Sequence, residues 1–491
     1  MKYEVIIGLE IHTELKTNSK MFCSCPNFNS QDKANANVCP ICLGHPGTLP
    51  VVNKEAINMA IILGLALNGE INRVSKFDRK NYFYPDLPKG YQISQYDLPI
   101  VENASLDIDD ESVHIVRLHL EEDTAKLTHP TGENYSLADF NRAGTPLIEL
   151  VTAPVIKNAL GAKKFCQKFQ QILRYLEISD ADMEKGQMRC EANISLQTPG
   201  SFTIKQNQVL AKDNQTLNAK VEVKNINSFK SVEKAINYEI ERQTKLLDQG
   251  EMIIPETRGW SDSQNITVSQ RIKESAADYR YFPEPDIPPL KIPEEMIDDL
   301  RSRIVELPDA KIKRFESEYQ ISRDSAEVLA LDKYLAGWYE QVIAELKDKN
   351  SAAQIAAHWI NNELFKLYPL NRFQESATQG RITPTNFALL INLLAEKKIS
   401  SAGGQKILNH LNQHGGQPLE IMKELELEQV MDNAGLEEKI IEIINSFPEQ
   451  MAAYKNGKVA LLQFFIGKVM AGTKGRANPQ ELEKIIKEIL K

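Results

Sequence analysis

The sequence predicts an α+β fold, in which a domain built on a large antiparallel sheet precedes an all-helical region. Up to about residue 290, short runs alternate polar and apolar residues and are separated by turn residues, as in antiparallel strands. The stretch 283–293 then carries five prolines, which neither a helix nor a central strand accommodates. Beyond it the apolar residues recur at helical spacing.

The periodicity of the first region predicts its main elements. Strands are expected where apolar residues alternate with polar ones, and helices where apolar residues lie three or four positions apart. The expected strands are 114–120, 146–151, 189–196 and 220–224, and the expected helices are 54–67 and 231–247.

The helical region predicts two further domains. Glycines between Ser400 and Gly416 interrupt the helical pattern and indicate a boundary. The last helix has Asn478 as its expected cap and Pro479 in its first turn, followed by an apolar stripe. We therefore expect three domains, which are 1–292, 293–400 and a small α-helical tail, 401–491.

Composition and charge narrow the class of protein. With 491 residues, 42% hydrophobic and 25% charged, the chain is a globular protein of several domains. A net charge of −9 argues against indiscriminate coating of nucleic acid, although it allows a local basic surface. The longest apolar run, 56–67, is too short to cross a bilayer, and the acidic start of the chain does not fit a signal peptide. The sequence therefore predicts a cytoplasmic protein with no membrane partner.

Four of the six cysteines form a pattern typical of a zinc site. Cys23 and Cys25 make one short pair and Cys39 and Cys42 another, within the loop 22–44. Two such pairs can close a tetrahedral Zn²⁺ site, which would be structural because four thiolates leave no open position. Buried or redox-active free thiols are the alternative. Cys166 and Cys190 stand alone in the sequence and are expected to pack as small apolar residues.

Near the start of the chain, the run GLEIHTEL places Glu10, His12 and Glu14 on one face of a strand and Leu9 and Ile11 on the other. The apolar face is expected to be core. The polar face fits either a functional site or an ordinary solvated surface, and the run itself does not decide between them.

A second carboxylate favours the functional interpretation. Glu149 lies in the apolar run TPLIELV, where a buried carboxylate needs a cation as partner. Glu121 and Glu122 end another alternating run, in which Arg117, His119 and Glu121 share one face. Carboxylates with one histidine suit a hard cation such as Mg²⁺ that also carries phosphate, and zinc is the alternative ion. Spacing alone also leaves open a set of surface carboxylates.

At residues 139–150, DFNRAGTPLIEL resembles the signature of the B subunit of the bacterial tRNA-dependent amidotransferases. Other stretches resemble the same family in the same order along the whole chain. They include 7–17, 76–95, 118–129, 188–196, 222–229, 278–290 and 467–479.

The resemblance implies a fold and a function. The family's B subunit has a cradle-like domain, binds misacylated Glu-tRNA(Gln) or Asp-tRNA(Asn), and uses ATP and Mg²⁺ to phosphorylate the side-chain carboxylate. Its partners in a heterotrimer are the A subunit, which is an amidase that releases ammonia from glutamine, and the small C subunit. The chain itself has no recognisable glutaminase motif. The tail after about Ser400 resembles the family's tRNA-sensing module.

The resemblance also assigns residues. Glu10, His12, Glu122 and Glu149 match the family's Mg²⁺-binding and catalytic positions. Alternation by itself selects Glu121 instead of Glu122, and Glu121 is the reserve. Candidates for contacts to ATP or to the same site are Lys80, Lys89, Arg142, Glu191 and Lys224.

Two rival functions remain at this stage. The chain could be a non-catalytic, zinc-stabilised adaptor that binds tRNA and whose carboxylates are structural. It could also be a metallohydrolase that works without ATP. Measuring product formation with and without ATP distinguishes both rivals from the ATP-dependent amidotransferase that the resemblance implies.

Overall fold

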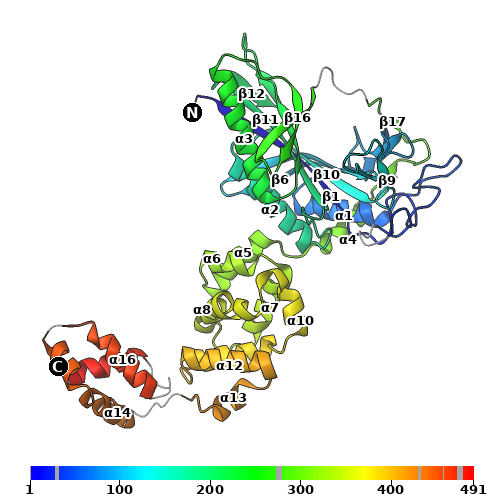
Figure 1. Cartoon of the computed structure of the whole chain (residues 1–491). Helices are drawn as coiled ribbons and strands as arrows, with labels where there is room; N and C mark the ends of the chain where they lie inside the picture. Colours follow the sequence, from blue (N-terminus) through cyan, green and yellow to red (C-terminus); the bar gives the residue numbers. More distant parts are fainter. Residues whose placement is uncertain are drawn as a thin grey trace. The chain divides into compact units, whose positions relative to one another are not determined.

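The computed structural model describes residues 2–27, 33–272, 279–428, 433–456, 458–472 and 479–490. The chain divides into two compact units, residues 1–307 and 308–491. The first unit is sheet-based and the second is helical (Figure 1). This is the α+β architecture that the sequence predicts.

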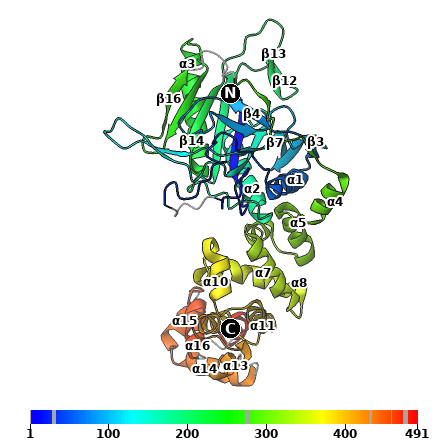
Figure 2. The ribbon, with the colours of Figure 1, turned by 90° about the vertical axis from the view of Figure 1, so that its right-hand side faces the viewer.

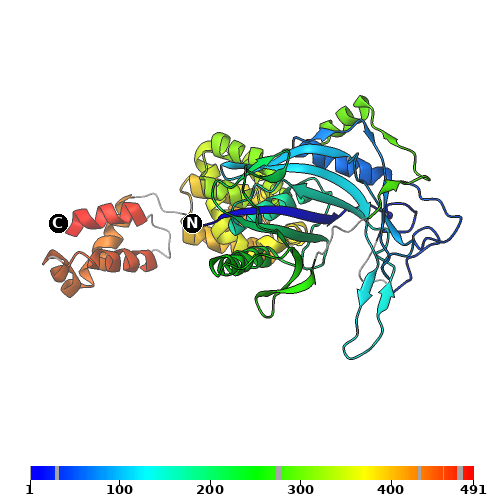
Figure 3. The same ribbon diagram turned by 90° about the horizontal axis from the view of Figure 1, so that it is seen from above.

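A nine-stranded sheet forms the centre of the first unit. Its order is β16-β15-β14-β11-β1-β10-β7-β6-β2, and β1 runs through its middle (Figure 3). The strands are β1 (Glu4–Glu14), β2 (Glu70–Ile71), β6 (Val101–Ile108), β7 (Glu111–Glu122), β10 (Pro146–Thr152), β11 (Met188–Gln197), β14 (Val221–Ile226), β15 (Glu256–Ser261) and β16 (Ile266–Ile272). The four predicted strands correspond to β7, β10, β11 and β14.

One pair of strands corrects the prediction of an antiparallel sheet. β14 and β15 are parallel, whereas every other neighbouring pair in this sheet is antiparallel. Between them runs α3 (Phe229–Asp248), and a helical crossover is the connection that parallel strands require. Ser228 caps this helix by accepting a hydrogen bond from the amide of Ser231.

Helices cover one face of the sheet. α1 (Lys54–Ala66), α2 (Ala159–Tyr175) and α3 pack their apolar sides into one core with the sheet (Figure 1). Ile7, Leu9 and Ile11 of β1 are at most 1% exposed and belong to this core. The alternation predicted for β1 is confirmed, and it directs Glu10 and His12 to the opposite face.

Cys166 of α2 and Cys190 of β11 are buried in the same core, as predicted for small apolar residues. Their sulfur atoms lie 3.5 Å apart.

Smaller sheets surround the large one. β4 (Asp78–Asn81) lies between β5 (Tyr91–Ser94) and β17 (Phe282–Pro283), so chain segments some 200 residues apart meet there. A hairpin of β12 and β13 stands beside the large sheet (Figure 2). The remaining short strands are β3 (Val74–Ser75), β8 (Lys126–Thr128), β9 (Leu137–Asp139), β12 (Phe202–Lys205), β13 (Gln208–Ala211) and β18 (Leu290–Lys291).

After β18 the described part of the chain forms only helices and their connections. They are α4 (Glu294–Ser302), α5 (Pro308–Tyr319), α6 (Arg323–Leu329), α7 (Lys333–Ala344), α8 (Lys349–Trp359), η1 (Ile360–Leu364), α9 (Phe365–Leu367), η2 (Leu370–Arg372), α10 (Phe373–Gln379), α11 (Pro384–Ala395), α12 (Ser401–His414), α13 (Pro418–Glu424), α14 (Asn433–Asn445), α15 (Pro448–Lys455), α16 (Leu461–Gly472) and α17 (Pro479–Leu490).

The glycines near residue 400 do not interrupt a helix, contrary to expectation. Gly404 lies inside α12, where an added Cβ would come within 2.6 Å of the Trp359 ring. Glycine at this position therefore allows close packing of α12 against its neighbour. The chain turns instead at Gly415 and Gly416, both of which have positive φ.

The cores of the helical unit also differ from the predicted division at residue 400. One cluster of buried residues extends from Phe315 to Leu427 and includes Ile407 of α12. A separate cluster extends from Ile440 to Ile486. The expected cap of the last helix, Asn478, lies outside the described residues. Among the helices that are described, none has the length and apolar character needed to span a membrane.

Candidate metal and active site

Four neighbouring strands of the large sheet bring one polar row together on the face opposite the helices. In an antiparallel pair, residues directly opposite each other point to the same face, so the register decides which side chains meet. Arg189 of β11 pairs with His12 of β1, His12 with Glu149 of β10, and Glu149 with His119 of β7. The row therefore joins residues that are up to 177 positions apart in the sequence.

Glu149 of this row, together with Glu10 and Glu121 of the two adjacent rows on the same face, surrounds two imidazoles. His12 Nε2 lies 3.3 Å from Glu149 Oε2, 3.4 Å from Glu121 Oε1 and 3.9 Å from Glu10 Oε1. His119 Nε2 lies 3.0 Å from the same Glu149 oxygen. We refer to Glu10, His12, His119, Glu121 and Glu149 as the carboxylate–imidazole group.

The electrostatics of the group follow from burial and mutual charge. Burial raises the pKa of Glu149, but the charges and hydrogen bonds of His119 and His12 outweigh it and hold that pKa well below its usual value. Burial lowers the pKa of His12, but the charge and hydrogen bond of Glu149, together with the charges of Glu121 and Glu10, raise it to about 9. Burial and the charges of Glu149 and Glu191 raise the pKa of Glu10 to about 7. Protonated His12 thus acts as the counter-ion of several carboxylates.

The donor atoms fit a divalent cation. Ligand atoms of Glu10, His12 and Glu149 lie within 4.8 Å of one another, and so do those of His119, Glu121 and Glu149. His119 Nδ1 is buried and has no hydrogen-bond partner among the described residues. Carboxylate oxygens with imidazole nitrogens suit Mg²⁺, Mn²⁺ or Zn²⁺. A bound cation would replace the counter-charge of protonated His12, so protons and the cation compete for this group.

A second acidic group adjoins Glu10. Glu191 faces Glu10 across β11 and β1, and its ligand atom lies within 4.8 Å of those of Glu10 and Glu222. Lys224 Nζ lies 2.9 Å from Glu191 Oε2 and 3.6 Å from Glu222 Oε1. Glu191 and Lys224, both predicted, therefore lie next to the carboxylate–imidazole group.

Lys80 approaches the group from β4, beside several tyrosines. Although burial lowers the pKa of Lys80, the negative charges of Glu121 and Glu149 raise it above its ordinary value. Its Nζ lies 5.1 Å from the centre of the Tyr279 ring, and Tyr279 packs edge-on against Tyr82. Lys80 is therefore a cation held close to both the carboxylates and an aromatic surface.

The positions of Glu122 and Lys89 differ from those that the sequence predicts. Glu122 pairs with Pro146 and continues the alternation of β7, so its side chain lies on the opposite face from Glu121. There its carboxylate lies 2.6 Å from Lys89 Nζ and accepts a hydrogen bond from the amide of Ile93. Strand alternation extends to the last residue of β7, which is why Glu121, the reserve, occupies the place expected for Glu122.

The side chain of Arg142 is engaged by the turn that follows β7 and does not extend toward the carboxylate–imidazole group. Its guanidinium donates to the carbonyls of Thr124 and Ala125 and lies 3.2 Å from Asp123 Oδ2. The buried Asp123 also accepts from Arg189, at 2.7 Å. The two arginines overcome the effect of burial and lower the pKa of Asp123. Arg142 therefore orders the end of β7.

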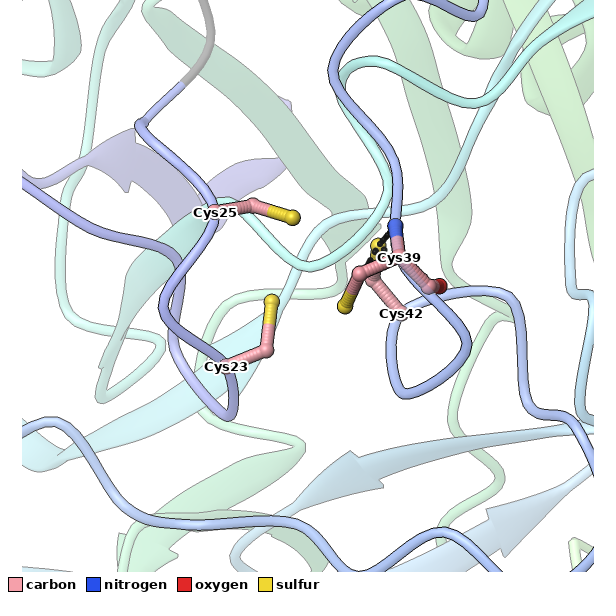
Figure 4. Close-up of side chains that lie close together, drawn as sticks. All are labelled: Cys23, Cys25, Cys39 and Cys42. Atoms are coloured by element: carbon pink, nitrogen blue, oxygen red, sulfur yellow. Dashed lines mark hydrogen bonds between the residues drawn. The ribbon is translucent and has the colours of Figure 1, made fainter.

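The four predicted thiols meet. Cys23 and Cys25 on one segment point toward Cys39 and Cys42 on another, and all four sulfur atoms lie within 4.8 Å of one another (Figure 4). The hydrogen bond from Cys23 lowers the pKa of Cys42 to about 4 against the effect of burial, and the Cys39 amide and Lys20 act in the same direction. Such a set fits a tetrahedral Zn²⁺. Part of the loop, residues 28–32, lies outside the described residues.

His119 is the member of the group that sequence reasoning did not assign to it. The signal was present, because His119 shares its face of β7 with Arg117 and Glu121. What the sequence lacked was the pairing of β7 with β10, which places His119 opposite Glu149.

Comparison with known proteins gives consistent matches. Residues 5–298 match a family model described as GatB/GatE catalytic domain, and residues 338–490 match one described as GatB domain. Proteins from Persephonella marina (43% identical), Carboxydothermus hydrogenoformans (42%) and Thermotoga maritima (43%) match over all of this chain. The match covers 99–100% of each relative's length. All three relatives are named as the B subunit of an aspartyl/glutamyl-tRNA(Asn/Gln) amidotransferase.

Proposed function

The chain belongs to the family of aspartyl/glutamyl-tRNA(Asn/Gln) amidotransferase B subunits, and on that premise we propose how it contributes to the reaction. The enzyme forms Gln-tRNA(Gln) or Asn-tRNA(Asn) from tRNA that carries glutamate or aspartate. This chain is the subunit that binds the misacylated tRNA and activates the side-chain carboxylate. The designation of the relatives as B subunits implies further subunits, which we take to be an amidase, the A subunit, and the small C subunit.

Activation uses ATP. A free carboxylate is a poor acceptor for ammonia, because its leaving group would be oxide. In the proposed step a carboxylate oxygen of the aminoacyl group attacks the terminal phosphorus of ATP, and ADP leaves. Ammonia from the amidase then attacks the acyl carbon, the C–O bond to phosphate breaks, and phosphate and a proton are released. Positioning and charge compensation are the main contributions of a protein to such a transfer.

The carboxylate–imidazole group is the observation that supports this proposal. Glu10, His12, Glu121, His119 and Glu149 would hold Mg²⁺. A bound Mg²⁺ would supply charge compensation for the phosphates of ATP. His119 and His12 keep Glu149 ionised, because both lower its pKa.

Two lysines near the carboxylate–imidazole group are candidates for contacts with the substrates. Lys80, at its edge, is placed to contact phosphate oxygens or the substrate carboxylate, because Glu121 and Glu149 keep it charged. Lys224 is neutralised by Glu191 and Glu222 and would contact an anion only by exchanging these partners.

The four thiols have a structural role in this proposal. A Zn²⁺ bound by Cys23, Cys25, Cys39 and Cys42 would hold two loop segments together and leave no open position for chemistry. Lys20 stabilises this loop further, since its Nζ lies 3.7 Å from Cys42 Sγ and donates to the carbonyl of Asn37.

The test is product formation by the assembled enzyme, with and without ATP. Amide formed on misacylated tRNA should require both ATP and Mg²⁺. Glu149→Gln should abolish it while tRNA binding persists. A Glu149→Gln enzyme with normal activity would favour the rival function, a tRNA-binding adaptor. Amide or hydrolysis product formed equally well without ATP would favour the metallohydrolase.

A further inference from the structure

Arg189 stands at one end of the polar row on the large sheet, and the proposed chemistry gives it no role. It pairs with His12 across β11 and β1, so the two side chains lie side by side on the face that carries the carboxylate–imidazole group. The charge of Arg189 interacts with those of Asp123, Glu14 and Glu121. A cation therefore borders the proposed Mg²⁺ position at this end of the row.

Two regions adjoin the carboxylate–imidazole group along β1. Toward the start of the strand lies a cavity of about 710 Å³, whose lining includes Gly8, Glu10 and Arg117. Toward the end of the strand lie Glu14 and Arg189, which do not line that cavity. In the proposed reaction a phosphate and a carboxylate reach the same metal ion, so they must come from different directions. The end of β1 is therefore a candidate region for the aminoacyl group.

The guanidinium of Arg189 is held in place but only partly engaged. Its Nη2 donates to Asp123 Oδ2 at 2.7 Å. Asp123 is 4% exposed and is itself held by the amide of Thr124 and by Arg142. The other N–H groups of Arg189 have no partner among the described residues, and 39% of its side chain is exposed. Arg189 thus presents fixed, available donors beside the metal position, and the planar guanidinium matches the geometry of a carboxylate.

Glu14 supplies the opposite charge. Glu14 and Glu121 both pair with Leu147 of β10, one from each side, and so form the row that follows His12 along the sheet. The carboxylate of Glu14 is half-buried and has no hydrogen bond or ion pair with any residue that the structure describes. A partly buried carboxylate without a partner is unfavourable, and a cationic group of a ligand would relieve this.

We propose that Arg189 and Glu14 bind the aminoacyl group of the misacylated tRNA, Arg189 through the side-chain carboxylate and Glu14 through the α-ammonium group. This rests on the proposed function and adds the residues that recognise this substrate. Glutamate or aspartate esterified to tRNA carries one carboxylate and one ammonium group, which is the pair of charges that the two residues complement. One carboxylate oxygen stays with Arg189 and the other is free to attack phosphorus.

The two residues then have different effects on selectivity. The amide of Gln-tRNA or Asn-tRNA carries no negative charge, so the product loses the charge-assisted contact with Arg189. The α-ammonium group is the same in substrate and product, so Glu14 does not distinguish between them. Arg189 therefore favours substrate over product, whereas Glu14 favours a free α-amine over a blocked one.

The first experiment measures binding of unreactive tRNA analogues to the assembled enzyme, with Mg²⁺ and without ATP. The analogues carry glutamate or glutamine through an amide bond at the 3′ end, which does not hydrolyse. The unchanged enzyme should bind the glutamyl analogue about tenfold or more tightly than the glutaminyl analogue. Arg189→Gln should reduce this preference to about threefold or less, and Arg189→Lys, which keeps the charge, should retain part of it.

The matched control is Lys185→Gln. Lys185 lies in the turn before β11 and 74% of its side chain is exposed. This variant removes a cation close to Arg189 in the sequence and should keep the full preference for the glutamyl analogue. In the complete reaction, Arg189→Gln should raise KM for the misacylated tRNA about tenfold or more and leave KM for ATP unchanged.

The second experiment tests Glu14 with a glutamyl analogue whose α-amine is acetylated. Acetylation removes the ammonium charge and should weaken binding to the unchanged enzyme about threefold to fivefold, as for a partly exposed ion pair. It should have little effect on binding to Glu14→Gln, because that variant has already lost the contact. Glu14→Gln should still prefer the glutamyl to the glutaminyl analogue as strongly as the unchanged enzyme does.

Each outcome supports or overturns one assignment. An unchanged glutamyl preference in a folded Arg189→Gln enzyme overturns the role of Arg189, and a raised KM for ATP in that variant would assign Arg189 to phosphate instead. If thermal unfolding shows that Arg189→Gln is not folded, Arg189→Lys provides the same comparison. An equal effect of acetylation on Glu14→Gln and on the unchanged enzyme overturns the role of Glu14. Amide formation without ATP would overturn the proposed function, and the unchanged enzyme alone reveals that result.

Discussion

The carboxylate–imidazole group and the four-cysteine group are both candidate metal sites, yet they are built in opposite ways. The cysteines lie within 20 residues of one another and need only a loop to meet. The carboxylates and imidazoles come from three strands and meet only because the sheet has one particular register. The first is a closed set of thiols that suits a structural ion. The second has polar neighbours, a cavity and unequal pKa values, which are features of a site that handles substrates.

The largest effect is expected from Glu149→Gln. The amide keeps the shape of the side chain but removes the charge shared by His12 and His119. Amide formation on misacylated tRNA should fall by at least about 100-fold, the loss typical when charge stabilisation is removed from a transition state. The measurement is initial rate in the assembled enzyme at saturating Mg²⁺. A matched control is Glu111→Gln, which removes an exposed carboxylate at the start of β7.

The neighbours Glu121 and Glu122 provide the sharpest comparison between the two faces of the sheet. Glu121→Gln should raise the Mg²⁺ concentration needed for activity about tenfold or more, because it removes a carboxylate close to His12. Glu122→Gln should leave that concentration unchanged and lower the melting temperature, since Lys89 loses its partner. Mg²⁺ titrations and thermal unfolding of both variants test this. The reverse pattern would restore Glu122 to the metal site.

Removal of zinc tests whether the cysteine group is structural. A Cys42→Ser variant, or treatment with a thiol-selective zinc chelator, should lower the melting temperature by several degrees, because the metal contributes folding free energy. The dependence of the remaining activity on Mg²⁺ should not change. Zinc content by atomic absorption should be one ion per chain before treatment. Loss of Mg²⁺ dependence together with zinc would contradict a purely structural role.

The smallest effect concerns Glu14, which continues the polar face of β1. Burial and the charge of Asp123 raise its pKa to about 7, although Arg189 and Arg142 oppose them. The folded protein therefore binds this proton more tightly than the unfolded chain. The resulting stability is present below the ordinary pKa of glutamate and is lost as pH rises through 7. Glu14→Gln should reduce the decline in stability between pH 5 and pH 8 by about 1 kcal/mol. Denaturant unfolding at both pH values measures it, and an unchanged decline would refute the prediction.

Local sequence patterns predicted much of the fold. The alternation in residues 8–15 predicted which face of β1 is buried, and the boundaries of α1 and α3 follow from helical periodicity. Two features of the fold depend on contacts that local patterns do not contain. Glycine at position 404 lets α12 approach the Trp359 ring, and the parallel pairing of β14 and β15 depends on a helical crossover that periodicity does not specify.

The candidate site shows which features local sequence patterns do not predict. Alternation predicts that Glu121 and Glu122 lie on opposite faces of β7, and the register confirms this placement, whereas the resemblance selected Glu122, whose side chain lies on the face away from His12 and Glu149. Arg142 was expected to contact phosphate. Its guanidinium instead donates to the backbone carbonyls of residues 124 and 125, and the sequence alone does not show these contacts.

By itself the sequence determined the four-cysteine loop, the polar face of β1 and the family, because these depend on spacing over a few residues or on matching stretches of chain. Only the tertiary structure decided that His12, Glu149 and His119 stand in one row and that Arg117 faces a cavity beside it. The physical reason is strand register. Side chains alternate with a period of two, so a shift of one residue between β10 and its neighbours would send Glu149 into the apolar core, and the register is set by the packing of the whole sheet.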